Sequence, residues 1–439
     1  MQENQITDNN SRRHTTLLLL ALIYVFSYID RNVIAILIEP IKNEFNASDT
    51  AMGMLTGMAF AVLYAVMGVP LGRLVDKGFS RRNMIATCCG IWSIATMACG
   101  MASNYIQLLF ARMTVAVGEA GGMAPSVSMV SDLYPPHRRS LVISLFMMGP
   151  HVGLIAAMVA GGYIAQQYGW RTVFIVFGAP GILFALLLWL FGKEPKRELA
   201  EKTSTSEQES SSTLIQHVLE LLSIPAFRYI CLGCGVAGIA GYGYGMWAPT
   251  FLVRSYGMSL AHAGLLFGLA SGVFAAFGAI FSGWYCDKLT KRDSRWQIRL
   301  PNIGVIISLP IGVAFLLWPT SGVWTFGTLV VPHAIVFAAA FGFFNSWWPS
   351  LSYAASSHML TASQRATGAA LLNLFLTLLG AGLGPLTSGI LSDQLNNMYG
   401  DDGLRYALAI VLSLLLFTVV FFSMATSRYT SRLNELNNS

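Results

Sequence analysis

The stretch that most constrains this chain is Leu108 to Val130, an apolar segment long enough to cross a bilayer that nevertheless carries Arg112 and Glu119. A charge at mid-membrane costs roughly 2.5–3.5 kcal/mol on insertion scales, so it normally faces a protein interior or a water-filled cavity. Residues seven apart lie about two helical turns apart on one face. An isolated buried carboxylate is more easily neutralised than kept charged. Glu119 is therefore predicted to carry protons, with Arg112 as its partner or as the ligand of an anion.

Composition places the whole chain in a membrane. Of 439 residues 54% are hydrophobic and only 11% are charged, whereas a soluble domain carries roughly 25% charged residues. The sequence contains no nucleotide-binding loop, no metal-spaced cluster and no nucleophile elbow. We therefore expect neither an enzyme nor a bound metal or cofactor, and the absence of an ATP motif argues against a primary pump.

Apolar stretches of about 20 residues predict twelve membrane-spanning helices. They cover residues 15–38, 50–75, 83–102, 105–131, 140–166, 171–192, 226–252, 260–286, 300–318, 323–356, 366–391 and 404–426. With both termini inside, the inner segments hold 21 Lys and Arg and the outer segments hold 4, which fixes the orientation. The same bias accounts for the net charge of +6 without a nucleic-acid partner.

The two halves of the chain repeat. Gly72 and Asp76 after the second span match Gly283 and Asp287 after the eighth, at an offset of 211. Pro125-Ser126 matches Pro349-Ser350 at an offset of 224, and Gly149-Pro150 matches Gly384-Pro385 at 235. Matches in this order predict an all-α membrane protein of two pseudo-symmetric six-helix bundles. The bundles would be residues 1–192 and 226–439, joined by a charged, Ser-rich cytoplasmic linker at 193–225 that ends in an amphipathic helix.

Ionisable residues gather in the first bundle and aromatic residues in the second. Asp30 in the first span lies about as deep as Arg112, so we expect a buried network of Asp30, Arg112 and Glu119. Arg31 points away from Asp30 and is assigned to the substrate or to an outer gate. Offset 224 gives Arg112 and Glu119 only apolar counterparts. An aromatic wall is predicted instead, made of Tyr242, Tyr244, Trp247, Phe341, Trp347 and Trp348.

Such a cleft suits an amphiphile with a charged head and an apolar body. Two other readings stay open: the ion network only holds two helices together, or the aromatic residues face lipid. At the inner ends of the spans, Asp76 and Asp287 precede basic residues, and Asp132 is within reach of Arg73 or Arg81. We expect four of these residues to hold the halves closed as gates, namely Asp76, Arg81, Asp132 and Asp287.

Several runs resemble the major facilitator superfamily. The loop from Gly72 to Arg82 is similar to its best-known signature, except that the second glycine falls at 78 and Ser80 replaces a usual arginine. Gly149-Pro150 with Gly153 resembles its fifth-helix signature. Within the superfamily, four runs resemble the Spinster branch, namely Tyr28 to Arg31, Glu39 to Lys42, Gly118 to Gly121 and Ser131 to Pro135.

The resemblance implies alternating access and proton coupling. Spinster relatives move lysophospholipids and sphingosine phosphates, and in them the residues matching Asp30, Arg112 and Glu119 are linked to coupling and substrate binding. We therefore expect a monomeric secondary transporter of the inner membrane that carries an amphiphilic, anionic substrate with protons. The alternatives are a proton-linked importer of small organic anions, such as aromatic or sugar acids, and a receptor on the same fold that does not transport.

Overall fold

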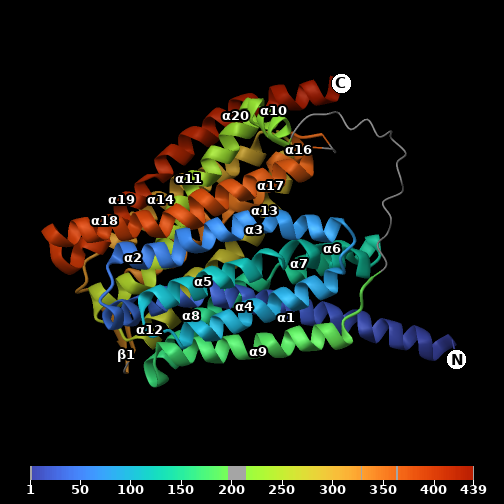
Figure 1. The fold of residues 1–439 in the computed structure, drawn as a ribbon. Coiled ribbons are helices and arrows are strands. Elements are labelled where there is room, and N and C mark those ends of the chain that lie inside the picture. The colour runs from blue at the N-terminus through green and yellow to red at the C-terminus, as the bar shows by residue number, and fades with distance from the viewer. Residues whose placement is uncertain (1, 196–213, 328, 362–363, 439) are drawn as a thin grey trace. The chain divides into compact units, whose positions relative to one another are not determined.

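The computed structural model describes residues 2–195, 214–327, 329–361 and 364–438, and within them the chain is almost entirely helical. It divides into two compact units. Unit 1 contains Met1–Ala47 and Ala59–Glu207, and unit 2 contains Ser48–Met58 and Gln208–Ser439. The long helices of each unit run roughly side by side (Figure 1).

Unit 1 is built from the first six predicted spans, apart from the beginning of the second. Its helices are α1 (Gln2–Phe45), α3 (Ala59–Asp76), α4 (Arg81–Gly100), α5 (Tyr105–Ala120), α6 (Met123–Leu133), α7 (Pro136–Phe146), α8 (Gly149–Tyr168) and α9 (Trp170–Phe191). Helix α4 packs most extensively on α9 and also on α5, and α1 packs on α8.

Unit 2 is built around the long helix α11, which packs on the last helix and on both parts of the eleventh span. Its elements are α2 (Asp49–Gly53), η1 (Met54–Met58), α10 (Leu214–Ser223), α11 (Pro225–Tyr256), α12 (Leu260–Phe267), η2 (Gly268–Val273), α13 (Phe274–Thr290), α14 (Trp296–Leu317), β1 (Val323–Phe326), β2 (Leu329–Pro332), α15 (Ile335–Asn345), α16 (Trp347–His358), α17 (Arg365–Phe375), η3 (Leu376–Leu383), α18 (Gly384–Tyr399), η4 (Gly400–Asp402), α19 (Gly403–Ser413) and α20 (Leu415–Asn438). The elements η1, η2 and η3 are π-helical turns, and η4 is a short 3₁₀ helix.

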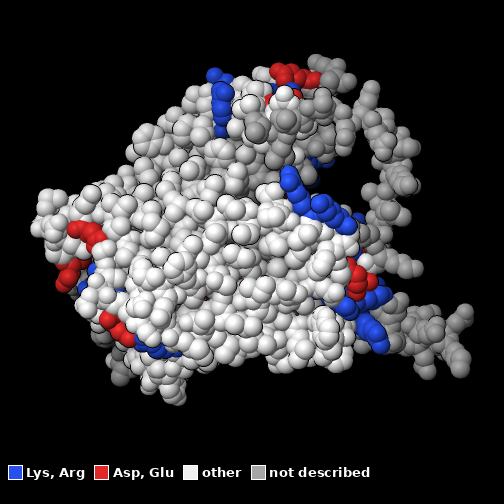
Figure 2. All heavy atoms as spheres, in the orientation of Figure 1, with Lys and Arg blue, Asp and Glu red and all other residues white. Residues whose placement is uncertain are grey.

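The twelve predicted spans are recovered, although four of them are interrupted. Among the described residues, nine helical stretches are long and apolar enough to cross a membrane, and the last, Thr367–Leu436, contains two spans. The fourth and tenth spans are each broken in two, into α5 with α6 and α15 with α16, and the fifth and twelfth are broken between α7 and α8 and between α19 and α20. On the face shown in Figure 2, charged side chains gather near the helix ends and leave an uncharged band between them.

Proline explains the breaks in the fourth and tenth spans. A proline inside a helix has no N–H for the carbonyl four residues earlier, and its ring clashes with that carbonyl. Pro125 lies four residues after Gly121, and Pro349 lies four residues after Asn345, which are the positions where the helices break. The two breaks are related by the repeat offset of 224, so the internal repeat extends to the irregularities of the helices.

The tenth span begins later than we expected. Residues 323–332 form the antiparallel hairpin of β1 and β2, with Val323 paired to Pro332 and Phe326 to Leu329. The alternation of Val, Trp, Thr and Phe favours a strand, and Gly327 turns the chain with a φ of +60°. The helical part of the span starts at Ile335.

The beginning of the second span belongs to unit 2 by its contacts, whereas we had placed all of residues 1–192 in the first bundle. Glycines allow backbone to meet backbone there, because a Cβ on Gly53 would lie 2.5 Å from the carbonyl oxygen of Pro385. A Cβ on Gly389 would lie 2.2 Å from the carbonyl oxygen of Asp49. Most of the predicted linker, residues 196–213, lies outside the described residues, and its predicted amphipathic helix is α10.

Candidate functional site

Four ionisable residues meet in the interior of unit 1, two on α1 and two on α5. Asp30, Arg112 and Glu119 are almost completely buried, with 1%, 1% and 2% of their surface exposed. Arg31 is partly buried, with 26% of its side chain exposed. Two acids and two bases therefore share one region of a bundle whose other side chains are mostly apolar.

Glu119 is held from α1. Its Oε2 accepts a hydrogen bond from the hydroxyl of Ser27 at 3.1 Å and forms an ion pair with the Nε of Arg31. Its Oε1 is buried and has no hydrogen-bond partner among the residues that the structure describes. The sequence pointed to Arg112 as the partner, but the structure gives this place to Arg31. Helical spacing fixes which residues share a face of α5, and it does not fix which side chain of α1 reaches them.

Asp30 and Arg112 are joined through the backbone. The Nη1 of Arg112 donates to the carbonyl oxygen of Asp30 at 3.0 Å, and the hydroxyl of Thr96 on α4 donates to the Oδ2 of Asp30 at 3.0 Å. Within the described chain, the Oδ1 of Asp30 and the Nε of Arg112 are buried without hydrogen-bond partners. Buried polar groups are usually satisfied, so the Oδ1 of Asp30 can accept a proton or a hydrogen bond, and the Nε of Arg112 can donate one to a ligand or a water molecule.

Aromatic rings surround the guanidinium of Arg31. Its Cζ lies 4.6 Å from the ring centre of Tyr64, 5.2 Å from that of Phe60 and 5.4 Å from that of Tyr28. A cation over an aromatic face gains about 0.5–2 kcal/mol, most where water is excluded. The rings help to hold Arg31 in place beside Glu119.

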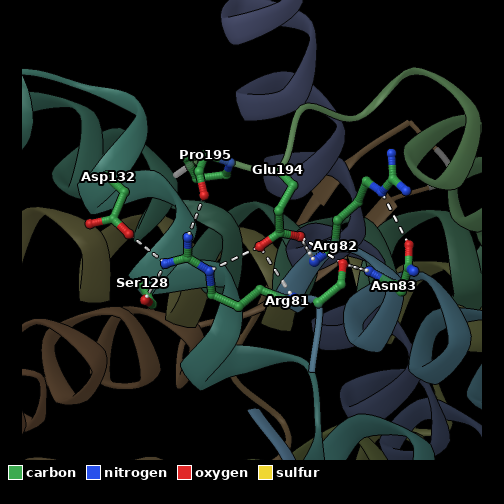
Figure 3. A network of polar contacts seen from close by, with 8 residues as sticks. Arg81, Arg82, Asn83, Ser128, Asp132, Glu194 and Pro195 are labelled. Atoms are coloured by element: carbon green, nitrogen blue, oxygen red, sulfur yellow. Dashed lines mark hydrogen bonds and ion pairs between the residues drawn. The ribbon is translucent and has the colours of Figure 1, made fainter. Parts of the chain in front are cut away.

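The predicted gating residue Arg81 is the centre of a second polar network at the end of unit 1 (Figure 3). Its Nη1 donates to Asp132 at 2.5 Å and to the hydroxyl of Ser128 at 2.8 Å. Its Nε donates to Glu194 at 3.2 Å and its Nη2 to the carbonyl oxygen of Pro195 at 3.0 Å. The arginine is only 2% exposed, so it is a buried joint between α4, α6 and the segment after α9.

Glu194 caps the start of α4 from the linker. Its carboxylate accepts hydrogen bonds from the hydroxyl of Ser80 and from the backbone N–H of Arg82, both at 2.8 Å. Burial alone would raise the pKa of Glu194, but these two hydrogen bonds and the Arg81 guanidinium outweigh it and hold the pKa below its usual value. Sequence reasoning missed Glu194, although an acid facing an exposed helix N-terminus is favourable.

The structure says less about the other two predicted gating residues, Asp76 and Asp287. The side chain of Asp76 lies outside the part of the chain that the structure describes. Asp287 is exposed, and it makes no ion pair with any described residue. The polar network around Arg81 therefore has no counterpart around Asp287 among the described residues.

The predicted aromatic wall lies in unit 2, and most of it is packed. Tyr244 packs against Phe341 with tilted rings whose centres are 4.4 Å apart, and both residues are nearly fully buried. Trp247 is 0% exposed, and its indole N–H donates to the carbonyl oxygen of Pro385 at 2.9 Å. Trp347 and Trp348 are each 5% exposed, whereas Tyr242 is 46% exposed. In this structure Trp247 is a packing residue, because it leaves no surface for a ligand.

Unit 2 also contains an apolar groove of about 590 Å³. Its walls come from α12, η2, α13 and α15, and the ten residues that line it are all hydrophobic. The largest of them are Phe274, Phe343, Phe344, Leu266, Leu269 and Ile335. A groove of this kind can take an acyl chain or another apolar body, and it offers nothing to a polar one.

A further polar cluster surrounds Asp49, which sequence reasoning missed. Both carboxylate oxygens of Asp49 accept from Arg254 at 2.8 Å, and Oδ2 also accepts from the hydroxyl of Ser392 at 2.6 Å. In turn the backbone N–H groups of Asp49 and Thr50 donate to the carboxylate of Asp393 at 2.9 and 2.7 Å. The cluster fixes the start of the second span within unit 2.

Comparison with known proteins agrees with this architecture. An "MFS-type efflux pump" of Mycolicibacterium smegmatis is 31% identical over 413 residues, covering 93% of this chain and 92% of that protein. "Protein spinster homolog 1" of Rattus norvegicus is 25% identical over 423 residues, covering 92% of this chain and 78% of that protein.

A solved structure is also similar along the whole chain. It is a bacterial homolog of the human lysosomal transporter Spinster in an inward-facing, unoccupied conformation. It superposes with a TM-score of 0.82 at 30% identity, covering 96% of this chain and 98% of that one. The pattern that defines the Major Facilitator Superfamily matches residues 20–334. Twelve spans in two related halves, the buried charges of unit 1 and these similarities together show that the chain is a transporter of the Major Facilitator Superfamily, in its Spinster-like branch.

Proposed function

We propose that this protein is a proton-coupled secondary transporter that moves an amphiphilic, anionic substrate by alternating access. The observation that carries the proposal is the ion pair between Glu119 and Arg31 beside the buried Arg112. Ionisable residues inside membrane spans mark ion and proton pathways by default. No described residue forms a metal-binding cluster that would suggest a coupling cation.

Coupling follows because Glu119 and the anionic group of the substrate compete for the guanidinium of Arg31. While Glu119 is ionised, it occupies Arg31. A proton on Glu119 removes that charge, so Arg31, held by its aromatic rings, becomes available to the anionic group of a substrate. Arg112 has a buried Nε without a partner among the described residues and offers a second donor. Protonation of Glu119 and binding of an anion therefore favour each other, which is the thermodynamic requirement for coupling.

The apolar groove of unit 2 supports an amphiphile over a small acid. Its walls are wholly hydrophobic, which suits the apolar body of a lipid-like molecule. The resemblance to the Spinster branch implies the same class of substrate. A small organic anion, the alternative from the sequence, would leave this groove without a role in binding.

The coupling proposal is tested in proteoliposomes with the variant Glu119→Gln. We expect the wild type to accumulate substrate when a proton gradient is imposed, and the variant to exchange substrate across the membrane without accumulating it. Glu44→Gln is the matched control, because Glu44 pairs with Arg171 with 42% of its side chain exposed. Accumulation that persists in Glu119→Gln would refute the proton-carrying role, and binding without any flux in the wild type would indicate a receptor.

The substrate class is tested by thermal stabilisation with a ligand panel. Lysophospholipids of one chain length and short carboxylates are compared at equal concentration. A rise of the melting temperature with lysolipids alone supports an amphiphilic substrate, since a ligand that binds only the folded protein raises its stability. A rise with short carboxylates alone would replace this assignment by a small-anion transporter.

We also propose that the protein works as a monomer in the inner membrane with both termini in the cytoplasm. The excess of Lys and Arg in the segments assigned to the inner side supports this orientation. Reporter fusions that are active only in the cytoplasm or only outside it, placed at the C-terminus, check the orientation. Activity of the outside reporter there would contradict it.

A further inference from the structure

The break in the tenth span places polar groups in the interior of unit 2. Helix α15 ends at Asn345 and α16 begins at Trp347, with Ser346 between them. Pro349 has no N–H for the carbonyl of Asn345, so this acceptor is left free by the chemistry of the chain. Transporters tolerate such irregular backbone at membrane depth where it is buried in protein or lines a cavity.

The side chain of Asn345 points from this break towards α11. A Cβ built on Gly241 would lie 3.6 Å from the Nδ2 of Asn345, and no other atom is within 4 Å of it. The Oδ1 of Asn345 is buried, and it accepts no hydrogen bond from any residue that the structure describes. An amide oxygen left in this way lacks a donor that it would have had in water.

Two buried hydroxyl groups lie one turn away. Tyr244 contacts Phe341 on α15, and a Cβ on Gly342 would lie 3.1 Å from the carbonyl oxygen of Ser271 on η2. The hydroxyls of Tyr244 and Ser271 interact with each other. Three elements thus bring polar groups to one region, and neither α15 nor η2 contains an ionisable residue.

The same face of α11 is open one turn further along. A Cβ on Gly245, four residues after Gly241, would meet no described atom within 4 Å. Residues four apart share a helix face. The face of α11 next to Asn345 therefore borders on space rather than on packed side chains, and a ligand there would reach the amide.

We propose that Asn345 binds the substrate in the second half of the transporter, accepting a hydrogen bond from a hydroxyl or ammonium group of the substrate head. This inference rests on the proposed function. The buried amide oxygen of Asn345, which has no partner among the described residues, selects a donor. The hydroxyls of Tyr244 and Ser271 lie nearby.

The test measures the binding of matched probes to the full-length protein in lipid nanodiscs. One probe is a palmitoyl lysophospholipid with its glycerol hydroxyl and an ethanolamine ammonium. Two analogues of the same chain length lack either the hydroxyl or, by trimethylation, the ammonium N–H groups. We expect Asn345→Ala to weaken binding of the parent probe by about threefold to tenfold, as for one net hydrogen bond. The analogue that lacks the contacted group should bind wild type and variant alike.

Asn302→Ala is the matched control. Its Oδ1 is also buried without a partner among the described residues, but its Nδ2 donates to Ser423 on α20 at 3.0 Å. Asn345→Ser, which keeps an acceptor, should recover part of the affinity if Asn345→Ala folds poorly. Equal weakening for all three probes, or no weakening for any of them, would overturn the proposal.

Failure of this inference can be told apart from failure of the proposed function. Asn345 does not titrate, so its variants should keep the proton dependence of transport, whereas Glu119→Gln should lose it. If short carboxylates bind and lysolipids do not, the amphiphilic assignment fails. The same comparison is then made with a 2-hydroxy acid and its deoxy analogue, and an unchanged ratio of their affinities in Asn345→Ala would overturn the role of Asn345.

Discussion

The fourth and tenth spans break at equivalent positions, but the two breaks differ in chemistry. Gly121 follows the buried Glu119 in unit 1, in a region with four ionisable groups. Asn345 follows Phe343 and Phe344 in unit 2, next to an apolar groove and with no ionisable residue on α15. A shared proline fixes the backbone irregularity in both halves, whereas the side chains around it have diverged.

This difference teaches that the repeat conserves the geometry of the helices and not their chemistry. A broken helix exposes backbone groups near mid-span whatever its side chains are. One half has placed a buried ion pair there, and the other half has placed neutral polar groups and aromatic rings. Coupling and most of the recognition of apolar substrate are therefore expected to respond to mutations in different halves.

The largest expected effect comes from removing the charge of Glu119 in unit 1. Glu119→Gln should abolish proton-driven accumulation, because the amide can neither bind a proton nor hold Arg31 by charge. Loss of one partner of a buried pair also costs about 3–5 kcal/mol, so the melting temperature should fall as well. Substrate accumulation and melting are measured on the same preparation. If the variant still accumulated substrate, the expected division of coupling and apolar recognition between the two halves would be wrong.

The next largest effect is a loss of stability, and it compares two inner loops that are related by the repeat offset of 211. Arg81 is buried in contact with Asp132 and Glu194, and its counterpart Arg292 is exposed. Arg81→Ala should destabilise unit 1 by up to about 3 kcal/mol, since it removes a buried guanidinium from two partly exposed carboxylates. Arg292→Ala should cost no more than about 0.5 kcal/mol. Melting temperatures of the two variants check this, and equal shifts would show that both loops are held alike.

A smaller effect on stability tests how tightly the helix breaks at Gly121 and Asn345 are packed. A Cβ on Gly121 would lie 2.5 Å from the Sγ of Cys88 and 3.2 Å from a methyl carbon of Leu71. Gly121→Ala should therefore cost about 1–3 kcal/mol as overpacking. Asn345→Ala removes atoms next to open space and should change the melting temperature less. The opposite order would mean that the first break, and not the second, borders on a cavity.

The smallest effect is a dependence on pH. The pKa of Glu194 is held below its usual value, so its stabilising contribution is present above that usual value. The contribution is lost as the pH falls through the lowered pKa in the folded protein. We expect wild type to exceed Glu194→Gln in melting temperature near neutral pH, with the difference shrinking in acid. A difference that grows in acid would contradict the capping role of Glu194.

Much of the fold could be predicted from the sequence, because hydropathy reports directly on what a bilayer accepts. The spans, the repeat and the burial of Asp30, Arg112 and Glu119 follow from where apolar runs and charges lie. Pro125 and Pro349 also carried the signal for both helix breaks, through the missing N–H. The strand-like alternation of residues 323–326 was overlooked because it extends an apolar run.

The contacts between distant segments could not be predicted in the same way. The choice of Arg31 over Arg112 as the partner of Glu119 depends on how α1 is rotated against α5. The pairing of Asp49 with Arg254 joins residues 205 positions apart, which no local pattern reveals. Glu194 was hidden because the linker was interpreted as a connection and not as a cap.

The attachment of Ser48–Met58 to unit 2 has a consequence for taking the molecule apart. Asp49 supplies the carboxylate that Arg254 and Ser392 bind, so residues 208–439 alone lack a piece of their own packing. Two polypeptides produced separately, cut between Glu194 and Leu214, should each be incomplete when expressed singly. Co-expression would let the shorter fragment lend its second helix to the longer one, which makes this transporter a natural candidate for fragment complementation.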